Sequence, residues 1–170
     1  MAPRSTSRRP KKSSTSVWLP GTRTTTPTRP SVPLFDNSAW SRLISGSIPK
    51  ARAEMVVEQM DRRQLATCLP FLLEAGFSAL SAADHKTMMD RLGRLPHVAV
   101  DEEVERLALD AQRDLAHVGH HRIPLADVVI AACAHRAGTG VLHYDRDYDL
   151  IAEHTGLVYE SLWIAEPGNL

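Results

Sequence analysis

The sequence predicts a single α/β domain built on a mostly parallel sheet. Short apolar runs of strand length, as at residues 32–35 and 141–144, alternate with longer stretches that have helical periodicity. Prolines stand where several of these longer stretches begin, as at Pro70 and Pro124. The chain of 170 residues is long enough for one domain with a substantial core.

The elements follow in order from the first apolar run. Predicted strands occupy residues 32–35, 65–68, 97–100, 141–144 and 157–159, and residues 162–164 pack the end of the chain. Predicted helices occupy residues 39–44, 49–63, 70–78, 83–95, 101–117, 124–138 and 150–155. The helix that begins at Pro124 has no polar side chain from Val128 to Ala134, so we expect it to be buried on nearly every side.

Residues 1–30 differ from the rest in composition, and we assign the domain to residues 31–170. Residues 1–30 carry seven basic and no acidic side chains, whereas residues 31–170 have a net charge of −7. A Ser/Thr/Pro/Arg-rich segment cannot offset its ordering entropy, so we predict that residues 1–30 are disordered. This tail is a basic arm for nucleic acid, a spacer without a role, or the product of a start codon assigned too far upstream, and the last two are favoured.

The sequence has no recognisable targeting segment. No apolar run is long enough to cross a membrane and no secretory signal follows Met1, so we expect a soluble, cytoplasmic protein. Cys68 and Cys133 each lie in an apolar segment, and two buried thiols are favoured over one disulfide.

Four carboxylates are predicted to meet at the carboxyl edge of the sheet. Asp36 and Asp145 each follow a predicted strand, while Asp127 lies in the first turn of a helix that feeds a parallel strand. Glu74, early in a helix that follows a strand, reaches the same edge, where open α/β folds build their sites. The alternatives are structural: Asp36 caps the helix that follows it, and Glu74 is a partner of the helix dipole.

Carboxylates buried this close together require a counter-charge, because each makes the others harder to ionise. A hard divalent cation, Mg²⁺ or Mn²⁺, meets this need with oxygen ligands. One or two such ions activate a water molecule and stabilise the leaving oxygen in phosphodiester hydrolysis. The spacing of His117, His120 and His121 allows a zinc site, but a solvated turn is favoured because no cysteine lies near them.

These motifs resemble those of a PIN-domain ribonuclease, and more narrowly those of a bacterial VapC-type toxin from a type II toxin–antitoxin pair. The resemblance rests on Asp36 with the Asn-Ser-Ala that follows it, on Glu74, on residues 124–132 around Asp127 and on residues 143–149 around Asp145. It covers about residues 32–164 and implies a three-layer α/β/α sandwich. The basic tail departs from the family pattern, because members generally begin just before the first strand.

The resemblance also implies a role for each acid. Asp36 and Asp127 would be the primary metal ligands, and Asp145 would be a further ligand through a water molecule. Glu74 would complete the catalytic set, either as a ligand or as the base that positions a water molecule. Asp147 is a second-choice ligand, because the final motif brings two acids near the pocket.

Partners and neighbouring groups follow from the same resemblance. The substrate would be a structured RNA such as tRNA or rRNA, the protein would form a homodimer, and a cognate antitoxin would insert a basic side chain into the acidic pocket. Asn37 and Ser38 would orient Asp36. Arg42 and Arg146 are candidates for contact with phosphate, although surface roles are favoured for both.

Other functions compete with this one. The first is a PIN-like module that has lost catalysis and binds RNA or a protein. The second is a nuclease for DNA or flap structures, whose larger relatives carry a helical arch that 140 residues cannot accommodate. A metal-free cyclising nuclease would need a His/Lys set at a suitable spacing, and the eight histidines provide none.

Overall fold

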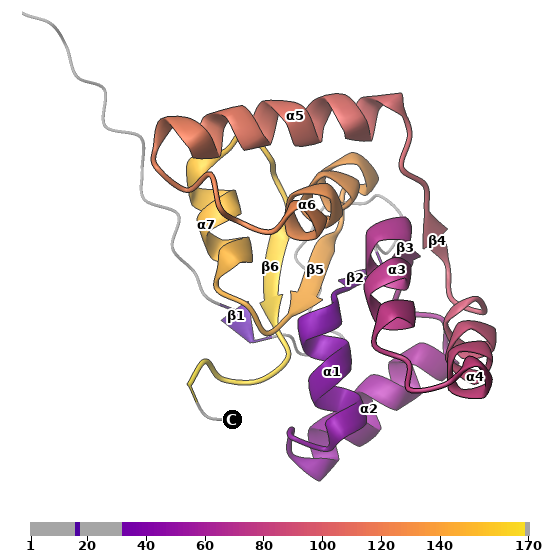
Figure 1. Cartoon of the computed structure of the whole chain (residues 1–170). Coiled ribbons are helices and arrows are strands. Elements are labelled where there is room, and N and C mark those ends of the chain that lie inside the picture. The colour runs from indigo at the N-terminus through magenta and orange to yellow at the C-terminus, as the bar shows by residue number, and fades with distance from the viewer. Residues whose placement is uncertain (1–15, 18–31, 169–170) are drawn as a thin grey trace, which may run out of the picture.

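All strand pairings in the described part of the chain are parallel, in agreement with the predicted sheet. The computed structural model describes residues 16–17 and 32–168, and its architecture is a three-layer α/β/α sandwich (Figure 1). The strands are β1 (Ser16–Val17), β2 (Leu34–Phe35), β3 (Thr67–Cys68), β4 (His97–Val98), β5 (Gly140–His143) and β6 (Glu160–Trp163).

The main sheet has the order β1-β6-β5-β2, so β5 is an inner strand. Its register places Val141 beside Leu34 of β2. A parallel bridge between Leu34 and Ala66 joins β2 to the two-stranded sheet of β3 and β4. The backbone N–H of Asp36 donates to the Leu142 carbonyl oxygen at 3.1 Å, which brings the carboxyl ends of β2 and β5 together.

Seven helices surround these strands in the described part of the chain. They are α1 (Asn37–Ser45), α2 (Lys50–Asp61), α3 (Leu69–Phe77), α4 (Ala82–Leu92), α5 (Glu102–His117), α6 (Leu125–Ala137) and α7 (Asp147–His154). Asp101 caps α5 as expected for that residue type, and its carboxylate accepts the Val104 N–H at 2.9 Å. The predicted burial of α6 is confirmed, since its residues from Ile130 to Ala134 are fully buried.

The last strand and the last helix differ from the prediction. The prediction placed the strand at residues 157–159, but β6 is Glu160–Trp163 and pairs with β5. Val158 is 72% exposed, and its N–H donates to the His135 ring on α6 instead of to a strand. Residues 157–159 are apolar enough to resemble a strand, but only β6 lies in register with β5. Helix α7 begins at Asp147, three residues earlier than predicted.

One short part of the basic tail also belongs to the sheet. In β1, Ser16 pairs with Leu162 and Val17 with Trp163 on the outer edge of β6. The prediction of a disordered tail did not anticipate this pairing, and the rest of residues 1–30 lies outside the described residues. No described helix has the length and apolar character needed to cross a membrane. Cys68 and Cys133 are both buried and free, as favoured from the sequence.

Candidate active site

Asp36 is fixed where β2 turns into α1. Its side chain is 2% exposed, and Oδ2 accepts hydrogen bonds from the Ser38 backbone N–H at 2.7 Å and from the Ser38 hydroxyl at 2.5 Å. The Ser38 hydroxyl oxygen accepts the Tyr144 N–H at 2.8 Å, which ties this turn to the end of β5. Asp36 therefore caps the helix and also presents a carboxylate at the sheet edge.

Tyr148 connects Asp36 to the start of α6. Its hydroxyl is fully buried and donates to Asp36 Oδ1 at 2.7 Å, with a longer contact of 3.5 Å to Asp127 Oδ1. Burial and the neighbouring Asp36 and Asp127 raise the pKa of Tyr148 well above its usual value, so the hydroxyl keeps its proton and remains a donor. This role of Tyr148 was not predicted from the sequence, where the only available signal was an aromatic residue inside the acidic motif of residues 143–149.

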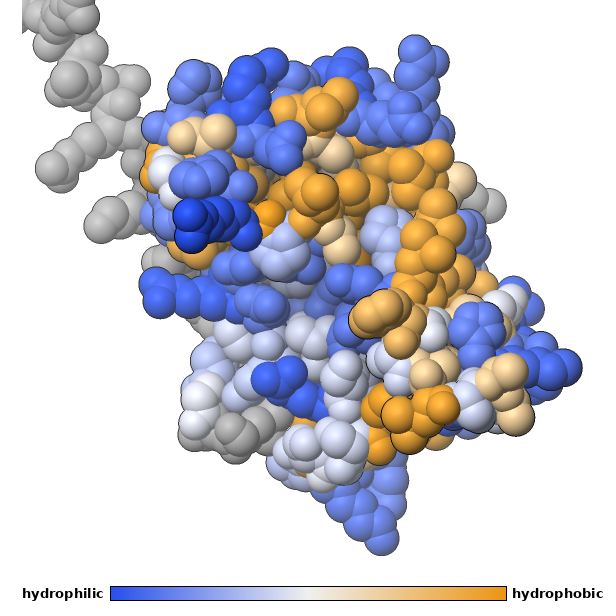
Figure 2. All heavy atoms as spheres, viewed as in Figure 1, coloured by the Kyte–Doolittle hydropathy of each residue, from blue (hydrophilic) through white to orange (hydrophobic). Residues whose placement is uncertain are grey.

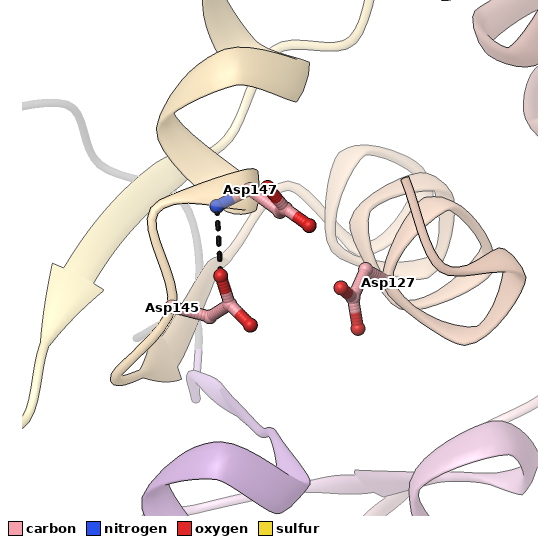
Figure 3. A group of neighbouring side chains, drawn as sticks. All are labelled: Asp127, Asp145 and Asp147. Carbon is pink, nitrogen blue, oxygen red and sulfur yellow. Dashed lines mark hydrogen bonds between the residues drawn. The ribbon is translucent and has the colours of Figure 1, made fainter. Parts of the chain in front are cut away.

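The carboxylates of Asp127, Asp145 and Asp147 meet beside Asp36 and Tyr148. Asp127 comes from the first turn of α6, Asp145 follows β5, and Asp147 begins α7 (Figure 3). One oxygen from each lies within 4.8 Å of the others, and Asp145 Oδ1 accepts the Asp147 N–H at 3.0 Å. Asp127 is buried, whereas Asp145 and Asp147 are half-buried.

The cluster carries more negative charge than its surroundings neutralise. Burial, followed by the charges of Asp36, Asp145, Glu74 and Asp147, raises the pKa of Asp127 to about 8. The pKa of Glu74 is raised by burial and then by Asp36, and that of Asp147 by burial and then by Asp145. Converging oxygen donors that repel one another fit a hard divalent cation, which would return Asp127 to its ionised form. Asp127, Asp145 and Asp147 are the residues placed to hold such an ion.

The family of the protein is decided by its match to known sequences. Residues 34–154 match the model of the PIN domain. The chain belongs to the PIN-domain family. Ribonuclease VapC18 of Mycobacterium tuberculosis is 39% identical over 138 residues, which is 79% of this chain and 96% of the relative. Ribonuclease VapC17 of the same species is 36% identical over 121 residues, covering 70% of this chain and 86% of the relative, so this PIN domain is one of the VapC ribonuclease family.

Solved structures share the fold of this PIN domain. DNA-bound VapBC from Salmonella typhimurium aligns with a TM-score of 0.60 at 14% identity, over 79% of this chain and 99% of that chain. VapBC-5 from Mycobacterium tuberculosis aligns with a TM-score of 0.54 at 19% identity, over 78% of this chain and 99% of that chain. At these identities the similarity shows the architecture alone.

Asp149, the third acid of the motif at residues 143–149, lies apart from the acidic cluster. Asp149 accepts the Ser161 hydroxyl at 2.5 Å and the Trp163 indole N–H at 3.2 Å, so it is bound to β6. Ser161 also contacts His143 Nε2 at 2.7 Å, and His143 Nδ1 accepts the Asp145 N–H at 3.1 Å. Burial lowers the pKa of His143 to about 3, so the ring is neutral and this chain of hydrogen bonds orients Asp145.

The predicted site residues take different places around the acidic cluster. Asp127 and Asp145 lie together, and the second-choice Asp147 joins them. Asp36 lies outside that group of three and reaches it through Tyr148. The charge of Glu74 acts on Asp127, and Glu74 lies past the first turn of α3, which begins at Leu69.

The histidines that follow α5 are not part of the acidic cluster. Among the described residues, the only group of three or more side chains with metal-ligand geometry consists of the three aspartates. His120 instead stacks on His154 of α7, with ring centroids 5.0 Å apart. His120 lowers the pKa of Asp147, but by less than burial and Asp145 raise it.

Proposed function

We propose that this PIN domain is a metal-dependent endoribonuclease that hydrolyses RNA phosphodiester bonds as the toxin of a toxin–antitoxin pair. The observation that carries the proposal is the convergence of Asp127, Asp145 and Asp147 within 4.8 Å beside the buried Asp36. Membership of the VapC ribonuclease family supports the same activity.

The side chains divide the work of hydrolysis. Asp127, Asp145 and Asp147 are assigned as the residues that hold Mg²⁺ or Mn²⁺, and Asp36, which is connected to Asp127 through Tyr148, is assigned as a further ligand. When bound, the ion supplies a water molecule of lowered pKa and a positive charge for the phosphate. Glu74, whose pKa is raised by burial and by Asp36, is suited to orient that water molecule and accept its proton. Ser38 and Tyr148 keep the Asp36 carboxylate in place, and the Asp147 N–H does the same for the Asp145 carboxylate.

Cleavage of RNA by the purified full chain tests this function. Asp36→Asn and Asp127→Asn are each expected to reduce cleavage at least 100-fold, and excess EDTA is expected to abolish it. Asp90→Asn, which changes an exposed acid paired with Lys86 on α4, is the control and should cleave normally. Full activity of both site variants, or cleavage in EDTA, would contradict the proposal. Growth inhibition that persists in Asp36→Asn would support a catalytically silent binding module instead.

The RNA substrate is assigned to the class of structured RNAs, tRNA or rRNA, on family grounds. Sequencing of RNA ends after brief expression of the protein in bacteria would identify the cut. Ends that map to one loop of a tRNA or rRNA are expected, whereas ends spread over messenger RNA would contradict this assignment.

A cognate antitoxin is the proposed protein partner. The solved neighbours include VapBC complexes and a toxin–antitoxin complex from Klebsiella pneumoniae. The acidic cluster favours a basic side chain from such a partner, since an arginine or lysine would neutralise the same carboxylates as the metal. Co-expression with the small protein encoded next to the gene should relieve growth inhibition, and Asp127→Asn should weaken the complex. A complex of undiminished affinity would exclude insertion of a cation into the site.

A second copy of the chain is the proposed occupant of an apolar stripe on α3. Its exposed side chains are Leu69, Leu73 and Phe77 on α3, Leu80 in the turn after it, and Leu125 on α6. Figure 2 shows this apolar surface as a continuous band over α6 and α3. Phe77 and Leu80 are 93% and 95% exposed, which is unfavourable for a monomer in water. A two-fold dimer buries the stripe against itself.

The oligomeric state distinguishes a dimer from a monomer. Light scattering of the purified chain should give twice the mass of 18.8 kDa. The substitution Phe77→Glu should give a monomer, whereas Val158→Glu, which alters an exposed apolar residue away from the stripe, should leave the dimer intact. A monomeric parent that associates only with its antitoxin would assign the stripe to the antitoxin.

A further inference from the structure

Arg42 lies next to the acidic site on the last turn of α1. Its Nη1 donates to the Ser38 carbonyl oxygen at 3.1 Å. The Ser38 hydroxyl bonds Asp36 and accepts the backbone N–H of Tyr144, the residue directly before Asp145. Ser38 therefore connects the Arg42 guanidinium to the Asp36 carboxylate.

The guanidinium is held in place by an aromatic ring. Its carbon lies 4.0 Å from the centroid of Tyr144, which is a cation–π contact. The ring is itself fixed, because the Tyr144 hydroxyl donates to the Glu166 carbonyl oxygen at 3.3 Å and accepts the Gly168 N–H at 3.1 Å. Trp163 meets the ring edge-on, with centroids 5.4 Å apart. An arginine ordered in advance loses less conformational entropy when it binds a ligand.

In the described part of the chain, Arg42 lacks an acidic partner but is held by an aromatic ring, and this combination separates it from the paired arginines of the protein. Ion pairs with carboxylates are formed by Arg62, Arg106, Arg113 and Arg136. Arg42 forms no ion pair with any described residue, although Ser38 connects it to Asp36. The guanidinium has five N–H donors, and its one hydrogen bond to an oxygen is to Ser38, so most of its donors remain for a ligand.

The ligand that fits these donors is a phosphate group. An RNA backbone that approaches a cluster of carboxylates is repelled unless cations at the rim offset the charge. A planar guanidinium matches the oxygens of a phosphate better than an ammonium group does. We propose that Arg42, held on the ring of Tyr144, binds a backbone phosphate of the RNA next to the bond that is cut. This inference rests on the proposed nuclease function.

The test measures the binding of bulk tRNA, labelled with fluorescein at its 3′ end, to the full chain carrying Asp127→Asn, which leaves the RNA intact. Arg42→Met is expected to raise Kd about tenfold and to reduce the slope of log Kd against log salt concentration by roughly 0.7–0.9. Arg42→Lys keeps the charge and should retain the slope, with a smaller increase in Kd. Arg91→Met removes an arginine from the last turn of α4 and should change neither quantity.

Three results would overturn the inference. The first is an Arg42→Met variant in which neither Kd nor the salt slope changes. The second is an Arg42→Met variant in which Kd rises but the salt slope does not change. If Arg42→Met lowers Tm by more than a few degrees, its loss of binding could reflect unfolding, and Arg42→Lys is measured in its place. The third overturning result is then an unchanged Kd for Arg42→Lys. If the chain without any substitution neither binds nor cleaves RNA, the proposed nuclease function is overturned as well. If that chain cleaves RNA and Arg42→Met leaves RNA binding unchanged, only this inference is overturned.

Discussion

At the scale of single residues, the site depends on one buried hydroxyl as well as on its carboxylates. Tyr148 is the only described residue that contacts both Asp36 and Asp127 through a hydrogen bond. Its proton lies between two groups that would otherwise repel each other in a medium of low dielectric constant. Tyr148 therefore acts as a positioning residue for the acids.

Replacing this hydroxyl tests its positioning role. Tyr148→Phe leaves Asp36 Oδ1 without its donor and is expected to lower the free energy of unfolding by about 1–3 kcal/mol at pH 7. Urea denaturation in EDTA measures this change, and RNA cleavage should fall at least tenfold. Tyr144→Phe removes a hydroxyl that bonds only exposed backbone groups and should cost less than about 1 kcal/mol. Equal costs for the two variants would contradict a special role for Tyr148.

The raised pKa of Asp127 makes the stability of the metal-free protein depend on pH. The pKa rises from 3.8 to about 8 in the folded state, because of burial and four nearby acids. Between these values the folded protein binds more protons than the unfolded chain, so stability is lost as pH rises through this window. In EDTA, Asp127→Asn should remove this loss. At pH 9 its free energy of unfolding should exceed that of the parent by on the order of 2–4 kcal/mol.

Thermal unfolding between pH 5 and pH 9 measures this effect. Addition of Mg²⁺ should raise Tm of the parent at pH 8 but not that of Asp127→Asn, since binding to the folded state alone is stabilising. Asp90→Asn should follow the parent at each pH. A metal-free parent that gains stability from pH 5 to pH 9 would show that Asp127 is ionised without a metal.

At the scale of elements, the approach of β5 to β6 requires a glycine. A Cβ added at Gly140 would lie 2.8 Å from Leu162 Cδ1 and 2.9 Å from the Glu160 carbonyl oxygen. The strands would have to separate at the start of β5, the strand that carries Asp145 at its other end. Gly140→Ala is therefore expected to cost roughly 1–3 kcal/mol of stability.

Gly156 provides a matched control for this substitution. An added Cβ there meets no atom within 4 Å, and Gly156 is not among the glycines with positive φ. Gly156→Ala should therefore range from neutral to about 1 kcal/mol stabilising. Chemical denaturation compares the two variants, and a neutral Gly140→Ala would mean that the two strands adjust without cost.

Most elements could be predicted from local signals. Capping residues such as Asp101, and prolines at the starts of α3 and α6, mark helix ends that depend on neighbouring residues alone. The position of β6 was wrong because register with β5 decides it, and register is a relation between distant segments. The pairing of β1 with β6 was missed for the same reason.

At the scale of the whole molecule, the topology explains how much of the site could be predicted. Parallel strands bring their carboxyl ends to one edge, so Asp127 and Asp145 could be expected together from their positions in the sequence. The role of Tyr148 could not be predicted, because it depends on the direction of a side chain on α7. The binding of Asp149 to Ser161 and Trp163 required the position of β6.

The basic tail can be tested by deletion. Removal of residues 2–30 is expected to leave RNA cleavage within about twofold of the full chain and to cost no more than about 1 kcal/mol, because the described part of the tail adds only two residues to the sheet. Removal of residues 2–15 retains β1 and should not change the free energy of unfolding. Cleavage assays and urea denaturation measure both variants. A large loss of RNA affinity on either deletion would assign RNA binding to the tail.

The hydrogen bond from Tyr148 to Asp36 joins residues 112 positions apart. During translation, Asp36 leaves the ribosome long before its partners, and the nascent chain has no functional centre until α7 has emerged. A polypeptide released early by a stop codon or a broken message would therefore be harmless. The acidic site is therefore complete only after residues 145–148 have been synthesised.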